Sequence, residues 1–253
     1  CRGYRLIVYS DHGQEAVGAY EKRHGKTIQE AVAEVASSVD VGGGSIRSKK
    51  AGTEKNYSAD RARGLWSKGE PKAAFHENGP IAADNVRVEA LGPIGHIYFP
   101  MALKGEVKKA LAEALVKRAH IPLVLYHDSE SVEAVNGAGS FSLPAQGVEA
   151  VGKDHPHIER VTEDLAQICR HPKAGDLVIC GWRPGFRPVT FATENGAHGG
   201  PGKEETSGFL LMPPNNAEGV QDLRPLDLRM KIFEMLGIDP DDPLTASEAG
   251  RRT

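Results

Sequence analysis

Several short segments of the chain consist only of apolar or aromatic residues, and helix-like segments separate them. The clearest apolar runs are Leu6–Tyr9 and Ile121–Tyr126. A strand that is apolar on both faces is typical of a parallel sheet covered by helices on both sides. The alternation of such strands with helices therefore predicts an α/β fold with a mostly parallel sheet flanked by helices.

Four segments of the chain have the spacing of apolar residues that is typical of an amphipathic helix. In one segment Thr27 is an N-cap candidate, and Glu30 three residues later completes the pattern of a capping box. Apolar residues recur at helical spacing there and in three later segments. The four predicted helices are Lys26–Val39, Gly105–Ala119, His157–Cys169 and Leu226–Ile238.

Two shorter extended runs, Val86–Ala90 and His96–Phe99, surround a Gly-Pro turn and predict a pair of strands. The stretch of about 41–79 has no period. It contains seven lysines and arginines between Arg47 and Lys68, and few aliphatic residues. We therefore expect a long mobile loop there.

The bulk composition excludes several classes of protein. The 253 residues carry a formal net charge of −3, whereas a general nucleic-acid binder is usually basic. No run of about 18 apolar residues is present, so no membrane segment is expected. The three cysteines form no C-x-x-C pair, which argues against a cysteine zinc site. We expect a soluble protein, with the cytoplasm as the default location.

The first candidate for chemistry is Asp11-His12-Gly13, directly after the first apolar run. At a turn, an adjacent carboxylate and imidazole can converge on one cation, and the glycine lets the backbone bend sharply. This mixture of ligands suits zinc and similar divalent ions. A surface turn would also explain the three residues.

The second candidate is the glycine-rich stretch Thr193–Thr206, which contains His198. Glycines surround this histidine, and such a loop is a poor place for a histidine that serves only packing. The stretch lacks the G-x-x-x-x-G-K-[ST] spacing of a phosphate-binding loop. We therefore interpret His198 as a metal ligand.

Other residues of metal-binding type have simpler interpretations. Asp154 and His155 directly precede a predicted helix, so we interpret them as part of its start. Together with Glu194 they are the first residues to test if the chain binds metal more tightly than Asp11, His12 and His198 allow.

The two motifs together resemble those of a known family. "LIVYSDHGQ" is followed, 186 positions later when His12 and His198 are compared (198 − 12), by "ENGAHGG", then by "FLLMPP" and "MKIFEMLGI". This series resembles the C-terminal half of type I phosphodiesterases and nucleotide pyrophosphatases, which belong to the alkaline phosphatase superfamily. The segments "GPIGHIYFP" and "EVKKALAEALVKRAHIPLVLY" look like the small α+β insert of those proteins. The resemblance covers roughly residues 4–238.

The resemblance implies a two-metal site. By motif, Asp11 and His12 would bind one ion and His198 the other, with zinc the expected metal and manganese an alternative. In that family the nucleophile and the remaining ligands precede the Asp-His-Gly motif. Only ten residues precede Asp11 here and none matches, and Ser10 stands where the family has an ordinary strand-end residue. We therefore expect the nucleophile N-terminal to residue 1.

The resemblance also implies a division of the chain. Residues 1–80 and 171–253 would form a partial alkaline-phosphatase-like core, and residues 81–170 an inserted α+β subdomain. The expected partners are a small phosphate-ester substrate and the missing N-terminal half of the same protein.

The function implied is metal-dependent hydrolysis of a phosphate ester or diester by the parent protein. The activity of the chain by itself stays open, because its nucleophile is missing. The alternative is a non-catalytic interaction or scaffold module that retains the fold.

Overall fold

The computed structural model describes residues 6–39, 86–129, 131–213 and 222–239. The predicted loop at about 41–79 lies outside these residues. The chain divides into two compact units, one made of Cys1–Gly13 with Gly208–Thr253 and the other of Gln14–Ser207. Within the described ranges, no helix is both long and apolar enough to cross a membrane.

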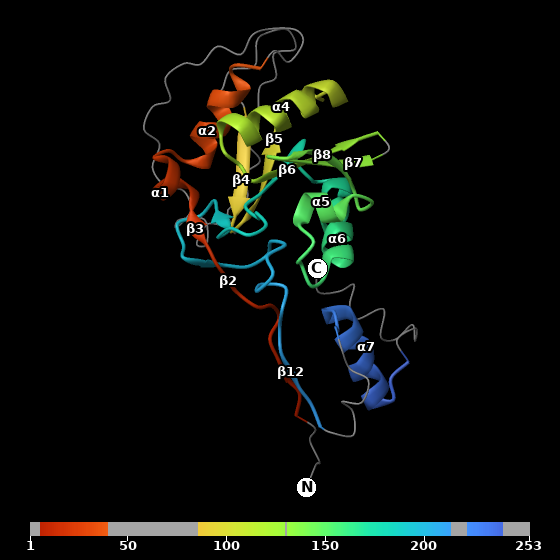
Figure 1. Ribbon diagram of the computed structural model, residues 1–253. Coiled ribbons are helices and arrows are strands. Elements are labelled where there is room, and N and C mark those ends of the chain that lie inside the picture. Colours follow the sequence, from red (N-terminus) through yellow and green to blue (C-terminus); the bar gives the residue numbers. More distant parts are fainter. Residues whose placement is uncertain (1–5, 40–85, 130, 214–221, 240–253) are drawn as a thin grey trace, which may run out of the picture. The chain divides into compact units, whose positions relative to one another are not determined.

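The larger unit is built on one six-stranded sheet with the order β4-β5-β9-β6-β7-β8. Helices pack on both faces of this sheet (Figure 1). The strands are β4 Arg87–Leu91, β5 Ile94–Tyr98, β6 Leu123–Asp128, β7 Ser131–Asn136, β8 Gly139–Leu143 and β9 Leu177–Cys180. The helices of this unit are α1 Tyr20–His24, α2 Ile28–Ala36, α4 Gly105–Arg118, α5 Gly147–Val151 and α6 Ile158–Arg170.

The central strand β9 is apolar throughout, because both of its faces are covered. In β9, Leu177 and Ile179 belong to one hydrophobic cluster, while Val178 and Cys180 belong to another. Successive side chains of a strand point to opposite faces of the sheet, so the two clusters lie on opposite faces. Residues of α2 and α4 join the first cluster, and residues of α5 and α6 join the second.

All six strands are antiparallel to their neighbours, so the predicted mostly parallel sheet is wrong. β5, α4 and β6 form a strand–helix–strand unit whose two strands run in the same direction, because each is antiparallel to β9. β9 comes from a later part of the chain and lies between them. The order of elements in the sequence therefore imitates a parallel sheet, whereas the pairing in space is that of a split strand–helix–strand unit.

The first apolar run also differs from its prediction. β1 is only Val8–Tyr9, and it pairs antiparallel with β12, Leu210–Leu211, in the smaller unit. The exposed fractions of Val8 and Tyr9 are 41% and 52%. This strand is therefore not a parallel strand covered on both sides, although its apolar pattern resembles that of the buried strands.

The remaining elements are short. In the larger unit, β3 (Gly18–Ala19) pairs parallel with β10 (Val189–Thr190), and β2 (Glu15–Ala16) pairs antiparallel with β11 (Gly196–Ala197). The smaller unit contains α7, Pro225–Leu236.

Predictions from local sequence are confirmed where interactions between nearby residues determine where a helix begins. The Thr27 hydroxyl accepts a hydrogen bond from the Glu30 backbone N–H, and the Glu30 carboxylate accepts one from the Thr27 N–H at 2.7 Å. This is the predicted capping box at the start of α2. All four predicted helices are present, with ends shifted by up to three residues.

Gly181 allows a close approach of two backbones at the end of β9. It accepts a hydrogen bond from the Val189 N–H at 2.9 Å and donates one to Pro93 O at 2.7 Å. A Cβ atom at this position would lie 1.7 Å from Val189 O. The junction between β9 and the segment that leads to β10 therefore requires glycine.

We expect Gly181→Ala to lower the free energy of unfolding by about 1–3 kcal/mol or more, because the added methyl group must displace backbone atoms. The matched control is Gly137→Ala, where an added Cβ meets no atom within 4 Å. The control should change stability by less than about 1 kcal/mol. Urea unfolding followed by circular dichroism measures both values, and equal values would contradict the packing described for Gly181.

Candidate functional site

Asp11 and His12 lie side by side after β1, in the smaller unit. The exposed fractions of their side chains are 82% and 37%, respectively. The His12 ring places its Nδ1 atom 2.6 Å from Gly13 O. A carbonyl oxygen can only accept, so the Nδ1–H group donates to Gly13 O, and in that tautomer Nε2 carries the lone pair.

The separation of the two candidate ligand atoms fits one metal ion. His12 Nε2 lies 3.5 Å from Asp11 Oδ1. Two ligand atoms on one tetrahedral zinc, each at about 2.0–2.1 Å from the ion, lie about 3.4 Å apart. Metal-binding histidines commonly donate their other ring N–H to a carbonyl or carboxylate, as His12 does to Gly13. The separation is compatible with two ligands of a single cation, and it is also that of a direct contact between the two side chains.

Ser10 has a structural contact rather than a catalytic one. Its hydroxyl accepts a hydrogen bond from the Phe209 N–H at 2.8 Å, and its N–H donates to Phe209 O at 3.0 Å. These bonds extend the pairing of β1 with β12, so the structure offers no reason to assign Ser10 as a nucleophile.

His198 follows β11 in the larger unit, at the start of a run of glycines. Its side chain is exposed, and the next residue, Gly199, has φ of +90°, a conformation that favours glycine. His198 thus lies in a different unit from Asp11 and His12. That His198 completes a site with these two residues stays a prediction.

A buried carboxylate holds the glycine run in place. Only 4% of Glu205 is exposed, and its two carboxylate oxygens accept hydrogen bonds from the N–H groups of Gly200 and Gly202 at 2.8 and 2.7 Å. Because these N–H groups already have an acceptor, they cannot also bind a phosphate. The structure therefore agrees with the sequence spacing, which also argues against a phosphate-binding loop.

His155 has a structural role as well. It is buried, its Nε2 donates to Pro201 O at 2.8 Å, and its Nδ1 accepts the His157 N–H at 3.1 Å. Both ring nitrogens are therefore used, and burial lowers the pKa of the ring despite the opposing effect of the bond to Pro201. His155 is a poor metal ligand, and it fixes the loop instead of capping α6. That helix has no side-chain cap.

Two further acidic residues join the loop to its surroundings. The Glu15 carboxylate accepts the Glu204 N–H at 2.8 Å. The Glu194 carboxylate accepts the Thr190 hydroxyl at 2.6 Å. Asp154, the other residue suggested for testing, is exposed.

Sequence reasoning identified the three ligand candidates but missed Glu205 and Glu15, and it did not anticipate the bond from His155 to Pro201. The run of glycines was the one available sign that an acceptor is needed nearby, because buried backbone N–H groups require hydrogen-bond acceptors. Glu205, which follows the run, is that acceptor. Over the part of the chain that the structure describes, no group of three or more His, Cys, Asp or Glu side chains converges as a metal site.

Comparison of the chain with protein-family models, with curated proteins and with solved structures gave no significant match.

Burial raises the pKa of Glu205, and the hydrogen bonds from Gly200 and Gly202 counteract this only in part. A carboxyl group whose pKa is higher in the folded than in the unfolded protein stabilises the fold fully below its unfolded pKa. That contribution is lost as pH rises through the folded pKa.

We therefore expect the stability advantage of the wild type over Glu205→Gln to be largest near pH 4 and to fall as pH rises toward 7. Glu204→Gln is the matched control, because Glu204 is exposed and should show no such trend. Urea unfolding at several pH values gives the required free energies. An advantage that grows with pH would show that the charged form of Glu205 is favoured in the folded protein.

Proposed function

We propose that this chain supplies ligands to a divalent metal centre that hydrolyses a phosphate ester or phosphodiester. The observation that carries the proposal is the Asp11–His12 pair, with Nδ1 of His12 held by Gly13 O and with Nε2 3.5 Å from Asp11 Oδ1. The resemblance of the two histidine motifs to phosphodiesterases and nucleotide pyrophosphatases supports the same function.

The roles of the residues follow from their chemistry. Asp11 and His12 hold one ion, and the bond from His12 to Gly13 fixes the orientation of the imidazole. His198 binds a second ion and is presented by the loop that Glu205 stabilises. Zinc suits this mixture of oxygen and nitrogen ligands, and manganese is the alternative. A pair of such ions, when bound, stabilises both the attacking and the leaving oxygen of an in-line displacement.

The proposed ligand set is incomplete. A catalytic zinc ion usually has three protein ligands and a structural one has four, whereas the chain provides two to one ion and one to the other. The remaining ligands and the nucleophile are therefore expected outside the residues assigned here. Metal binding by the chain alone should be weak.

Metal binding can be followed at His12 itself. Addition of zinc should shift the Nε2 signal of His12 in ¹H–¹⁵N spectra of the histidine rings, because Nε2 donates its lone pair to the bound metal ion. His12→Asn should remove this signal and weaken zinc binding at least tenfold, by analogy with the loss of supporting residues around other metal sites. His127→Asn is the matched control and should change nothing. A His12 ring that zinc leaves unchanged would exclude its role as a ligand.

Activity is tested with a chromogenic aryl phosphodiester in the presence of zinc or manganese. The chain alone should be inactive, and the chain extended toward the N-terminus by the sequence that its gene encodes there should be active. In the active protein, His12→Ala should lower kcat by about 100-fold or more, because it removes stabilisation of charge in the transition state. His127→Ala should leave kcat unchanged.

Two results would argue against this assignment. An extended protein that binds metal without hydrolysing any phosphate ester would favour a scaffold module. Activity of residues 1–253 alone would require a nucleophile within them that has not been assigned.

A further inference from the structure

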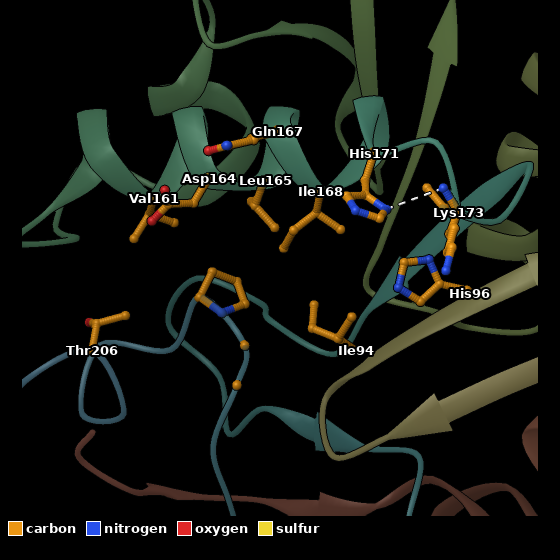
Figure 2. Close-up of a pocket in the computed structure, with 14 residues that line it drawn as sticks. Ile94, His96, Val161, Asp164, Leu165, Gln167, Ile168, His171, Lys173 and Thr206 are labelled. Atoms are coloured by element: carbon orange, nitrogen blue, oxygen red, sulfur yellow. Dashed lines mark hydrogen bonds between the residues drawn. The ribbon is translucent and has the colours of Figure 1, made fainter. Parts of the chain in front are cut away.

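The larger unit contains a cavity of about 610 Å³ between α6, β5 and the glycine-rich loop (Figure 2). Pockets that bind small molecules usually have volumes of about 300–1,000 Å³. The residues that line it come from three separate parts of the chain, which the fold holds together. All residues that line the cavity belong to the larger unit, whereas Asp11 and His12 belong to the smaller one.

The long walls of the cavity are apolar. Val161, Leu165 and Ile168 line it from α6 at positions i, i+4 and i+7, which lie on one face of a helix. Ile94 and Pro201 line it from β5 and from the loop. A ligand here would therefore place an apolar body between the helix and the loop.

One end of the cavity gathers hydrogen-bond donors. Figure 2 shows His96, His171 and Lys173 together at that end. The Nδ1 atom of His96 accepts the Gly175 N–H, and the Nδ1 atom of His171 accepts the Lys173 N–H, each at 3.2 Å. In the neutral rings the proton is therefore on Nε2, which leaves two Nε2–H donors beside one lysine ammonium group.

The ammonium group of Lys173 gives this end of the cavity its positive charge. Burial lowers the pKa of His96, and the neighbouring His171 lowers it further. The His96 ring is therefore neutral at neutral pH. Basic side chains near a helix C-terminus often bind its last carbonyl groups. The Nδ1 atom of His171 instead accepts the Lys173 N–H.

The acidic group of the cavity lies at the other end. Asp164 is beside Val161 in Figure 2, away from His171. The seven residues from Asp164 to His171 correspond to about 10 Å along a helix axis. The cavity therefore has a positive end, an apolar middle and an acidic end, and an anion is favoured only at the first.

We propose that this cavity binds a small organic anion, with its carboxylate or phosphate group at His96, His171 and Lys173 and its apolar body against α6. This inference does not depend on the proposed hydrolase function, because no residue of the metal-binding pair takes part. Gly199 and Gly200 also line the cavity, so the bound molecule would contact the residues that directly follow His198.

The test uses three probes with the same aromatic body: 2-naphthylacetate, 2-naphthylmethylphosphonate and 2-(2-naphthyl)ethanol. Binding to residues 1–253 is measured by calorimetry in buffer with EDTA, so the result is independent of any metal. Both anions should bind at least about tenfold more tightly than the neutral alcohol, because hydrogen bonds to an ionised group are stronger than those to a hydroxyl group. The preferred anion distinguishes a carboxylate ligand from a phosphate ligand.

Two exposed residues allow variants that should keep the fold. Lys173→Met removes the positive charge, and His171→Asn keeps an acceptor for the Lys173 N–H while it removes the Nε2–H donor. Each should weaken anion binding about five- to tenfold and leave the binding of the alcohol unchanged. Lys153→Met, at an exposed lysine outside the cavity, should have no effect.

Unfolding temperatures close to that of the wild type will show that the variants are folded. The proposal is overturned by equal affinity for the anions and the alcohol, by anion binding that neither variant weakens, or by the absence of binding at millimolar probe concentrations. A His12 ring that zinc leaves unchanged would overturn the metal-site proposal without affecting this one, so failure of the two proposals can be distinguished.

Discussion

The burial of β9 on both faces and along both edges is the constraint on which the larger unit depends. Its four residues, Leu177 to Cys180, are at most 1% exposed. The strand pairs with β5 on one side and β6 on the other. Such a strand needs helices over both faces of the sheet, which α4 and α6 supply. The position of α6 in turn creates one wall of the cavity and places His171 and Lys173 just before β9.

The glycine-rich loop depends on a second buried group. Glycines permit many backbone conformations, and without fixed partners such a loop would not hold a histidine in one place. Glu205 satisfies two of its N–H groups from inside, and His155 binds the carbonyl of Pro201. A buried acidic side chain is costly unless it is hydrogen-bonded. Both oxygens of Glu205 are bonded, so the loop and its carboxylate stabilise each other.

The sequence predicted those features that local interactions determine. Thr27 and Glu30 are three residues apart, so the start of α2 could be recognised without knowledge of the rest of the chain. The strands that pair with β9 are distant from it in sequence. A strand buried on both faces has the same apolar sequence whether the neighbouring strands run parallel or antiparallel to it. The exposure of Val8 in β1 had no local signal either.

The candidate site also contains features that local sequence determines and features that depend on distant contacts. Asp11 and His12 are adjacent in sequence, so the proximity of their side chains could be predicted from the turn that contains them. Glu205 lies in "GKEET", which has the composition of a charged surface segment. Its carboxylate is enclosed by the loop that pairs with β2, and no short segment of sequence contains that information.

The insertion of β9 between β5 and β6 has a consequence for folding. His96 pairs with Val178, 82 residues later (178 − 96), and Leu125 pairs with the same residue, 53 residues later (178 − 125). Contacts between such distant residues form slowly, because long loops must close first. β5 and β6 precede β9 in the chain, and until it arrives their inner edges have unpaired N–H and C=O groups. During synthesis, the unpaired edges of β5 and β6 are thus the place where a strand of another molecule can pair and start aggregation.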